Sequence, residues 1–134
     1  MRVIIAGSRT VADYWLVRAA VEAALAEWAD AGAVAEVVSG CNGRRDAAGR
    51  VVSGTDLLGE AWASAHAIPV KRFPADWNKH GKAAGPIRNR EMAAHATHLV
   101  AVWVGESRGT KNMIEEMEKL GKPVHVVRIA AARS

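Results

Sequence analysis

The chain has 134 residues, 50% of them hydrophobic and 24% charged, which is the balance of one ordinary globular domain with a genuine core. Cys41 is the only cysteine, so a disulfide framework is excluded and a reducing compartment is favoured. The apolar run at residues 2–6 is far too short for a signal peptide or a membrane span. We therefore expect a soluble, cytoplasmic protein with a single domain over residues 1–134 and no membrane partner.

The formal net charge is +4 and the sequence pI is about 9.6, which is compatible with nucleic acid or phosphorylated small molecules as partners. No long run of like charges occurs, and this argues against a basic tail that wraps nucleic acid. Many basic residues instead fall in stretches that we assign to loops, which favours an anion site: Arg9, Arg44, Arg45, Arg50, Lys79, Lys82 and Arg108.

Strands and helices alternate along the whole chain. Short apolar, β-branched runs predict strands over residues 2–6, 34–39, 68–73, 98–104 and 123–129. Helical spacing of apolar residues predicts helices over residues 11–31, 55–67, 86–96 and 111–120. Thr10 and Thr55 are the expected N-caps of the first two helices.

Three details of these elements are open to test. In the first helix the expected apolar stripe consists of Trp15, Ala19, Ala23 and Ala26, with Leu16, Ala20 and Leu25 alongside. Residues 40–54, with four glycines and three arginines, are expected to form an irregular loop or a short flexible excursion. Residues 130–134 are expected to be a frayed tail.

This alternation predicts an α/β fold: a Rossmann-like three-layer sandwich with a five-stranded, mostly parallel sheet and helices on both faces. In such sheets ligands bind beyond the carboxyl ends of the strands, near the point where the strand order reverses. The loops that follow a strand should therefore meet at one edge of the sheet. These loops are residues 7–10, 40–54, 74–85 and 105–110.

Two of these loops have the chemistry of a phosphate site. Residues 105–110, Gly-Glu-Ser-Arg-Gly-Thr, join a buried strand to a helix, so backbone amides and the helix N-terminus favour an anion there. The spacing is neither that of a P-loop nor that of a dinucleotide fingerprint, and a tight turn with no ligand is an equally good interpretation. If the first and fourth strands are neighbours, Arg9 and Arg108 face each other and bind the same anion.

The long polar loop that ends in the third helix is the most distinctive stretch. Asp76 offers a carboxylate for sugar hydroxyls and Trp77 an aromatic plane for a base, although Trp77 could equally anchor the loop. Arg88 and Asn89 suit phosphate or ribose hydroxyls, and the alternative is a solvated helix face. The five histidines lack metal-ligand spacing, no nucleophile elbow occurs, and Cys41 is expected to be a bystander, so neither a metal nor a cofactor is expected.

The chain resembles the SLOG superfamily, close to its YspA-like branch, nearly from end to end. The resemblance is carried by residues 7–9, by Ser39 and Gly40 followed by residues 54–56 and 59–63, by residues 73–92, and by residues 105–110 with Met113. It implies a Rossmann-like domain that binds nucleotides or nucleotide-derived ligands. Relatives in the superfamily include the Lonely Guy phosphoribohydrolases, the DNA-processing protein DprA, and sensor domains for ADP-ribose-type signals.

The sequence departs from this pattern in two places. Residues 41–53 are interposed where related sequences pass almost directly to the glycine turn. This insertion is expected either to reshape the pocket rim or to add a partner surface. Met113 stands where the Lonely Guy enzymes carry a catalytic glutamate, and a thioether cannot move protons. No catalytic residue is therefore expected. The residues expected to bind the ligand are Gly7, Ser8, Arg9, Ser39, Gly40, Gly54, Asp56, Asp76, Trp77, Lys82, Arg88, Asn89, Gly105, Arg108, Gly109 and Thr110.

The leading hypothesis is a sensor or sequestering domain for an ADP-ribose-like molecule or a nucleoside phosphate. In it, Asp56 and Asp76 meet ribose hydroxyls, and the phosphates are held by Arg9, Arg88, Arg108 and the backbone amides of residues 105–110. One alternative is a phosphoribohydrolase or deoxyribosyltransferase that uses Glu60, Asp76 or Glu106 in place of the missing glutamate. A second alternative is single-stranded DNA binding. A homo-oligomer, in the simplest case a dimer, remains open, and Trp15 and Trp28 on the alanine-rich first helix are the residues that suggest it.

Overall fold

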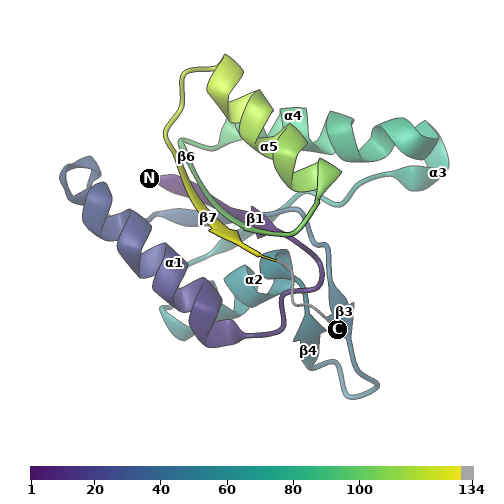
Figure 1. Cartoon of the computed structure of the whole chain (residues 1–134), viewed down its shortest axis with the longest axis horizontal. Helices are drawn as coiled ribbons and strands as arrows, with labels where there is room; N and C mark the ends of the chain where they lie inside the picture. Colours follow the sequence, from purple (N-terminus) through teal and green to yellow (C-terminus); the bar gives the residue numbers. More distant parts are fainter. Residues whose placement is uncertain (131–134) are drawn as a thin grey trace.

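The computed structural model describes residues 1–130, and residues 131–134, which include most of the tail expected to be frayed, lie outside the described residues (Figure 1). The strands are β1 (Arg2–Gly7), β2 (Glu36–Ser39), β3 (Arg44–Arg45), β4 (Val51–Ser53), β5 (Val70–Arg72), β6 (His98–Val104) and β7 (Val124–Ile129). The α-helices are α1 (Tyr14–Glu27), α2 (Thr55–Ala65), α3 (Trp77–His80), α4 (Ala84–His95) and α5 (Arg108–Lys119), with 3-10 turns at η1 (Ala29–Ala31) and η2 (Gly81–Ala83).

Within residues 1–130 the main sheet has five strands in the order β5-β2-β1-β6-β7, and every pairing is parallel. Ile4 of β1 is in register with Val38 of β2 on one side and with Leu99 of β6 on the other. The chain fills the sheet outward from β1 on one side and then crosses to β6 on the other. The boundary between β1 and β6 is therefore the switch point of the sheet. The α/β, Rossmann-like fold predicted from the sequence is confirmed.

The alternation of side chains along β1 explains the three layers. Val3 and Ile5 pack against α1 and α2 on one face, whereas Ile4 and Ala6 pack against α4 and α5 on the other. Figure 1 shows the two helix pairs on opposite sides of the sheet. Because both faces are covered, the strands read as continuous apolar runs rather than as alternating ones.

The main line of the expected apolar stripe of α1 is wrong, although the residues expected alongside it, Leu16, Ala20 and Leu25, do pack on the core. Trp15 is 65% exposed, and Ala19, Ala23 and Ala26 also face outward. The buried side chains are Val17, Ala20, Val21 and Ala24. Alanine is so frequent in this helix that more than one face fits helical spacing, and the larger valines decide which one packs on the sheet. The indole of Trp15 instead lies against the Arg18 guanidinium, 5.1 Å from its ring centre.

Both expected N-caps lie elsewhere. Helix α1 begins at Tyr14 and is capped by Asp13, whose carboxylate accepts from the backbone amides of Trp15 and Leu16. Thr55 is the first residue of α2 rather than its cap, and its hydroxyl is buried and donates to the Ser8 carbonyl at 3.0 Å. This hydrogen bond fixes the start of α2 against the end of β1.

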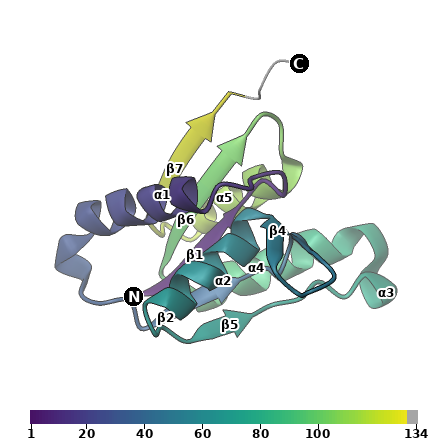
Figure 2. The same ribbon diagram turned by 90° about the horizontal axis from the view of Figure 1, so that it is seen from below.

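Two segments that were expected to be irregular contain regular structure. Residues 44–53 form an antiparallel hairpin, β3–β4, whose turn is held by the Asp46 carboxylate through the backbone amides of Ala48 and Arg50. Residues 77–83 form α3 and η2, and α4 begins at Ala84, two residues before Pro86. The hairpin and α3 lie at the same end of the molecule, as Figures 1 and 2 both show. In the described part of the chain, no helix is long and apolar enough to cross a membrane.

Candidate functional site

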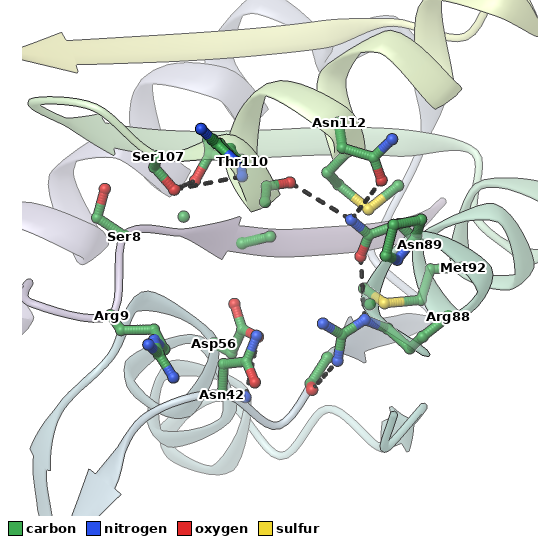
Figure 3. A pocket seen from close by; sticks show the side chains of 18 of the residues that line it. Ser8, Arg9, Asn42, Asp56, Arg88, Asn89, Met92, Ser107, Thr110 and Asn112 are labelled. Atoms are coloured by element: carbon green, nitrogen blue, oxygen red, sulfur yellow. Dashed lines mark hydrogen bonds between the residues drawn. The ribbon is translucent and has the colours of Figure 1, made fainter. Parts of the chain in front are cut away.

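A cavity of about 710 Å³ opens beyond the carboxyl ends of β1 and β6, at the switch point of the sheet (Figure 3). This volume is within the usual range for small-molecule sites. Met92 of α4 and Met113 of α5 form an apolar part of its wall, and both side chains are otherwise buried. Of the residues predicted from the sequence, the cavity is lined by Gly7, Ser8, Arg9, Gly40, Asp56, Trp77, Lys82, Arg88, Asn89, Arg108, Gly109 and Thr110.

One end of the cavity is built by the N-terminus of α5. Ser107 caps this helix: its hydroxyl accepts from the Thr110 backbone amide at 3.3 Å and contacts the Thr110 hydroxyl at 2.7 Å. The backbone amides of Arg108 and Gly109 lie in the first turn, where a helix supplies no acceptor of its own. Arg108 is the first residue of this turn, Arg9 lines the same cavity from the loop after β1, and both are exposed. The arrangement is that of an anion site.

Ser8 holds the two central loops in place. Its hydroxyl donates to the Val104 carbonyl at 3.1 Å and accepts from the Val104 amide at 2.9 Å. Its backbone amide donates to the Val102 carbonyl at 3.0 Å. These bonds join the ends of β1 and β6, which are the first and fourth of the predicted strands. The loops that carry Arg9 and Arg108 are therefore neighbours.

The other end of the cavity is built by Asp56 and Arg88, which are 4% and 6% exposed. One carboxylate oxygen of Asp56, Oδ2, accepts from the Asn42 backbone amide at 3.0 Å. Burial raises the pKa of Asp56 to about 6, against the opposing effects of this amide and of the Arg88 charge. A carboxyl group that titrates near neutral pH inside a cavity is typical of functional sites.

Arg88 and Asn89 are buried, so the alternative of a solvated helix face is wrong for this pair. Arg88 donates through Nη1 to the carbonyls of Gly40 and Phe73, and through Nε to Asn89 Oδ1 at 3.0 Å. Asn89 donates through Nδ2 to Asn112 Oδ1 at 2.9 Å and to the Gly109 carbonyl at 3.3 Å. The two side chains therefore connect α4 to the ends of β2 and β5 and to the first turn of α5.

Ser39, Gly54, Asp76 and Gly105 were predicted to bind the ligand but do not line the cavity. Ser39 is fully buried beneath it and donates to Glu60 at 2.6 Å. Gly54, at a φ of 115°, is where the chain turns into α2. Asp76 caps α3 and lines a separate, smaller pocket of about 210 Å³, and the Gly105 amide donates to the Ile129 carbonyl.

Several lining residues were not predicted from the sequence. Asn42 lies in the insertion, where no motif marks it, and Asn112 lies one turn inside α5. Ser107 has the signature of a cap, because a serine precedes a helix and a threonine follows three residues later. Thr10, Gly85, Pro86 and Glu106 fall within segments that the sequence singles out without marking them as contacts.

The carboxylates proposed for a hydrolytic alternative are mostly elsewhere. Glu60 is buried outside the cavity, where it accepts from Ser39 and from Arg72 at 2.9 Å. Glu106 is exposed at the rim, and Met113 occupies the wall. Burial, followed by the nearby Glu60 charge, raises the pKa of the Cys41 thiol, which disfavours a reactive thiolate. Among residues 1–130, no three histidine, cysteine or acidic side chains converge as metal ligands would.

Fold and site together define an α/β domain of the Rossmann-like class, with a cavity at its switch point that is lined by both polar and apolar side chains. No protein-family model matches the chain, and no solved structure matches it. One curated relative, the Gene 61 protein of Mycobacterium phage D29, is 36% identical over 77 residues, which cover 53% of this chain. The match spans 62% of the relative's own length.

Proposed function

We propose that this domain binds a nucleotide-derived small molecule, of the ADP-ribose or nucleoside phosphate kind, in the cavity at the switch point. The observation that carries the proposal is that one cavity combines a helix N-terminus and two exposed arginines with a buried polar end. The phosphate would lie against the first turn of α5, between Arg9 and Arg108. Trp77 and Pro86 offer a flat apolar wall for a base at the rim.

The binding is tested by calorimetry with ADP-ribose, cyclic ADP-ribose isomers, AMP and NAD. We expect heat with at least one of them, and a loss of about tenfold or more in affinity when Arg9 and Arg108 are both changed to alanine. Arg18→Ala is the matched control, because Arg18 lies on the outer side of α1, where it contacts Glu22 and the Trp15 ring and does not line the cavity. No heat with any ligand at millimolar concentration would overturn the proposal.

The biological role that we propose is sensing or sequestration of the ligand. Asp56 and Glu106 are the carboxylates that line the cavity, so a phosphoribohydrolase or deoxyribosyltransferase activity would depend on one of them. Incubation of the protein with AMP and dAMP, followed by chromatography of the free base, separates the two functions. We expect no release of base above that of a buffer blank, and release that Asp56→Asn or Glu106→Gln abolishes would establish the enzyme instead.

A cytoplasmic location and a homo-oligomer, in the simplest case a dimer, stay predictions. The outward-facing Trp15 on α1 is the feature of the described surface that keeps self-association open. Sedimentation velocity of the wild type and of Trp15→Ala tests it, since a dimer through this face would dissociate in the variant.

A further inference from the structure

A buried anion and a buried cation face the cavity without pairing with each other. Asp56 and Arg88 lie on either side of Gly40, and a Cβ atom added at Gly40 would be 2.9 Å from Asp56 Oδ2 and 3.0 Å from Arg88 Nη1. Yet no ion pair joins the two side chains in the described part of the chain. The missing side chain of Gly40 leaves the space between the two charges open.

Both groups keep hydrogen-bonding capacity for a ligand. Arg88 uses Nε and Nη1 on protein acceptors, and its remaining nitrogen, Nη2, makes no hydrogen bond with residues 1–130. The carboxylate of Asp56 has several acceptor positions: the Asn42 amide occupies one of them on Oδ2, and the Gly7 backbone amide also stabilises its charge. Figure 3 shows both side chains pointing into the cavity from opposite walls.

The chemistry of the gap selects what can enter it. A phosphate would be repelled by the Asp56 carboxylate, and an ammonium group would be repelled by Arg88. A purely apolar group would leave both charges buried and unsatisfied, which is costly. A hydroxyl both donates and accepts, so it can donate to Asp56 while it accepts from Arg88 Nη2.

We propose that Asp56 and Arg88 bind the vicinal hydroxyls of a ribose and so make the site selective for ribonucleotides over deoxyribonucleotides. This inference rests on the proposed function. The anion site on α5 would hold the adjacent phosphate, and the sugar would lie deeper, between Gly40 and the methionine wall. Asp76, which the sequence also suggested as a ribose contact, lies outside the cavity and takes no part.

The test compares affinities by calorimetry for AMP, 2′-deoxy-AMP and 3′-deoxy-AMP, with IMP as an analogue changed only at the base. We expect each missing hydroxyl to weaken binding by about tenfold, the effect of one hydrogen bond to a charged group. Asp56→Asn keeps the size of the side chain and should bring the three adenosine ligands to within about twofold of one another. Asp30→Asn is the matched control, since Asp30 is exposed beyond the far end of α1.

The outcomes separate the inference from the function on which it rests. Equal affinity of the wild type for AMP and both deoxy analogues would overturn the inference and leave nucleotide binding intact. A second outcome would also overturn the inference: the wild type distinguishes AMP from IMP, Asp56→Asn does not, and the deoxy analogues bind as AMP does. Asp56 would then contact the edge of the base. Binding of none of the four ligands would overturn the inference, and it would overturn the proposed function as well if ADP-ribose, cyclic ADP-ribose and NAD also give no heat. Gly40→Ala provides a second variant, because its methyl group would fill the gap and should abolish the preference for ribose.

Discussion

At the level of single residues, opposing effects act on the ionised form of Asp56. Its carboxyl group lies within the first turn of α2, where the helix favours an anion, and it accepts the Asn42 amide. Even so, burial raises its pKa to about 6. Above this pH the folded protein must keep a buried negative charge at Asp56, and a neutral side chain in the same place would avoid that desolvation cost.

The stability of the protein should reflect this raised pKa. Asp56 binds its proton more tightly in the folded state than in the unfolded chain, where an aspartate has its ordinary pKa of 3.8. Its contribution is therefore full below the unfolded pKa and is lost as the pH rises through about 6. Denaturant unfolding at several pH values should show the wild type losing about 2 to 3 kcal/mol relative to Asp56→Asn between about pH 4 and pH 7. If the free energies of unfolding of the two proteins change in parallel with pH, the raised pKa does not belong to Asp56.

Ligand affinity should change with pH in the opposite direction. Ribose hydroxyls donate to the ionised carboxylate, so binding should strengthen as the pH rises through about 6. ADP-ribose suits this measurement better than AMP, because its pyrophosphate is fully ionised across the range whereas a terminal phosphate titrates near pH 6. An affinity that Asp56→Asn leaves with the same pH dependence would show that another group is responsible.

Asn89 is a structural connector that the sequence suggested as a ligand contact. It is 7% exposed and joins α4 to α5 through Asn112 and the Gly109 carbonyl. Asn89→Ala would leave those partners unsatisfied, and we expect a loss of about 1 to 3 kcal/mol in the free energy of unfolding. Asn78→Ala on the exposed face of α3 is the matched control and should change stability by less than about 0.5 kcal/mol.

At the level of elements, the N-terminus of α5 does most to define the anion site, and Ser107 defines that N-terminus. Ser107→Ala removes the cap, so we expect a loss of about 1 kcal/mol in stability. The first turn should also fray and lower the affinity for a phosphate ligand. Asp13→Ala removes the corresponding cap of α1, at a distance from the cavity lining, and should cost similar stability with no change in affinity. Equal losses of affinity in both variants would mean that general stability, not the first turn, controls binding.

Apolar runs and strict alternation were enough to predict the sheet, its helices on both faces and the edge on which the loops meet. They did not predict which face of α1 is buried, because Trp15 fits the helical period as well as Val17 and Val21 do. The hairpin β3–β4 was missed because its strands are only two and three residues long, too short for an alternating pattern to be recognised. Asp76 was misplaced because a carboxylate at the start of a loop is as good a helix cap as a ligand contact.

At the level of the whole molecule, the basic character has two interpretations. A discrete phosphate site explains Arg9 and Arg108, whereas the exposed Arg44 and Arg45 on the hairpin belong to no described pocket. Binding of single-stranded DNA, the second alternative from the sequence, would use many such contacts and would weaken steeply with salt. Mononucleotide affinity that changes little with salt, together with no shift of an oligonucleotide at low salt, is the result that we expect.

The location of the ligand tests the central claim most directly. Amide chemical shifts of the labelled protein, followed by NMR during a titration with ADP-ribose and with AMP, report which residues contact it. We predict the largest changes at Ser8 and Arg9, at Asn42 and at residues 108–110, with little change at η1 or β7. Changes confined to the surface of the hairpin, or none at saturating ligand, would contradict the proposed site.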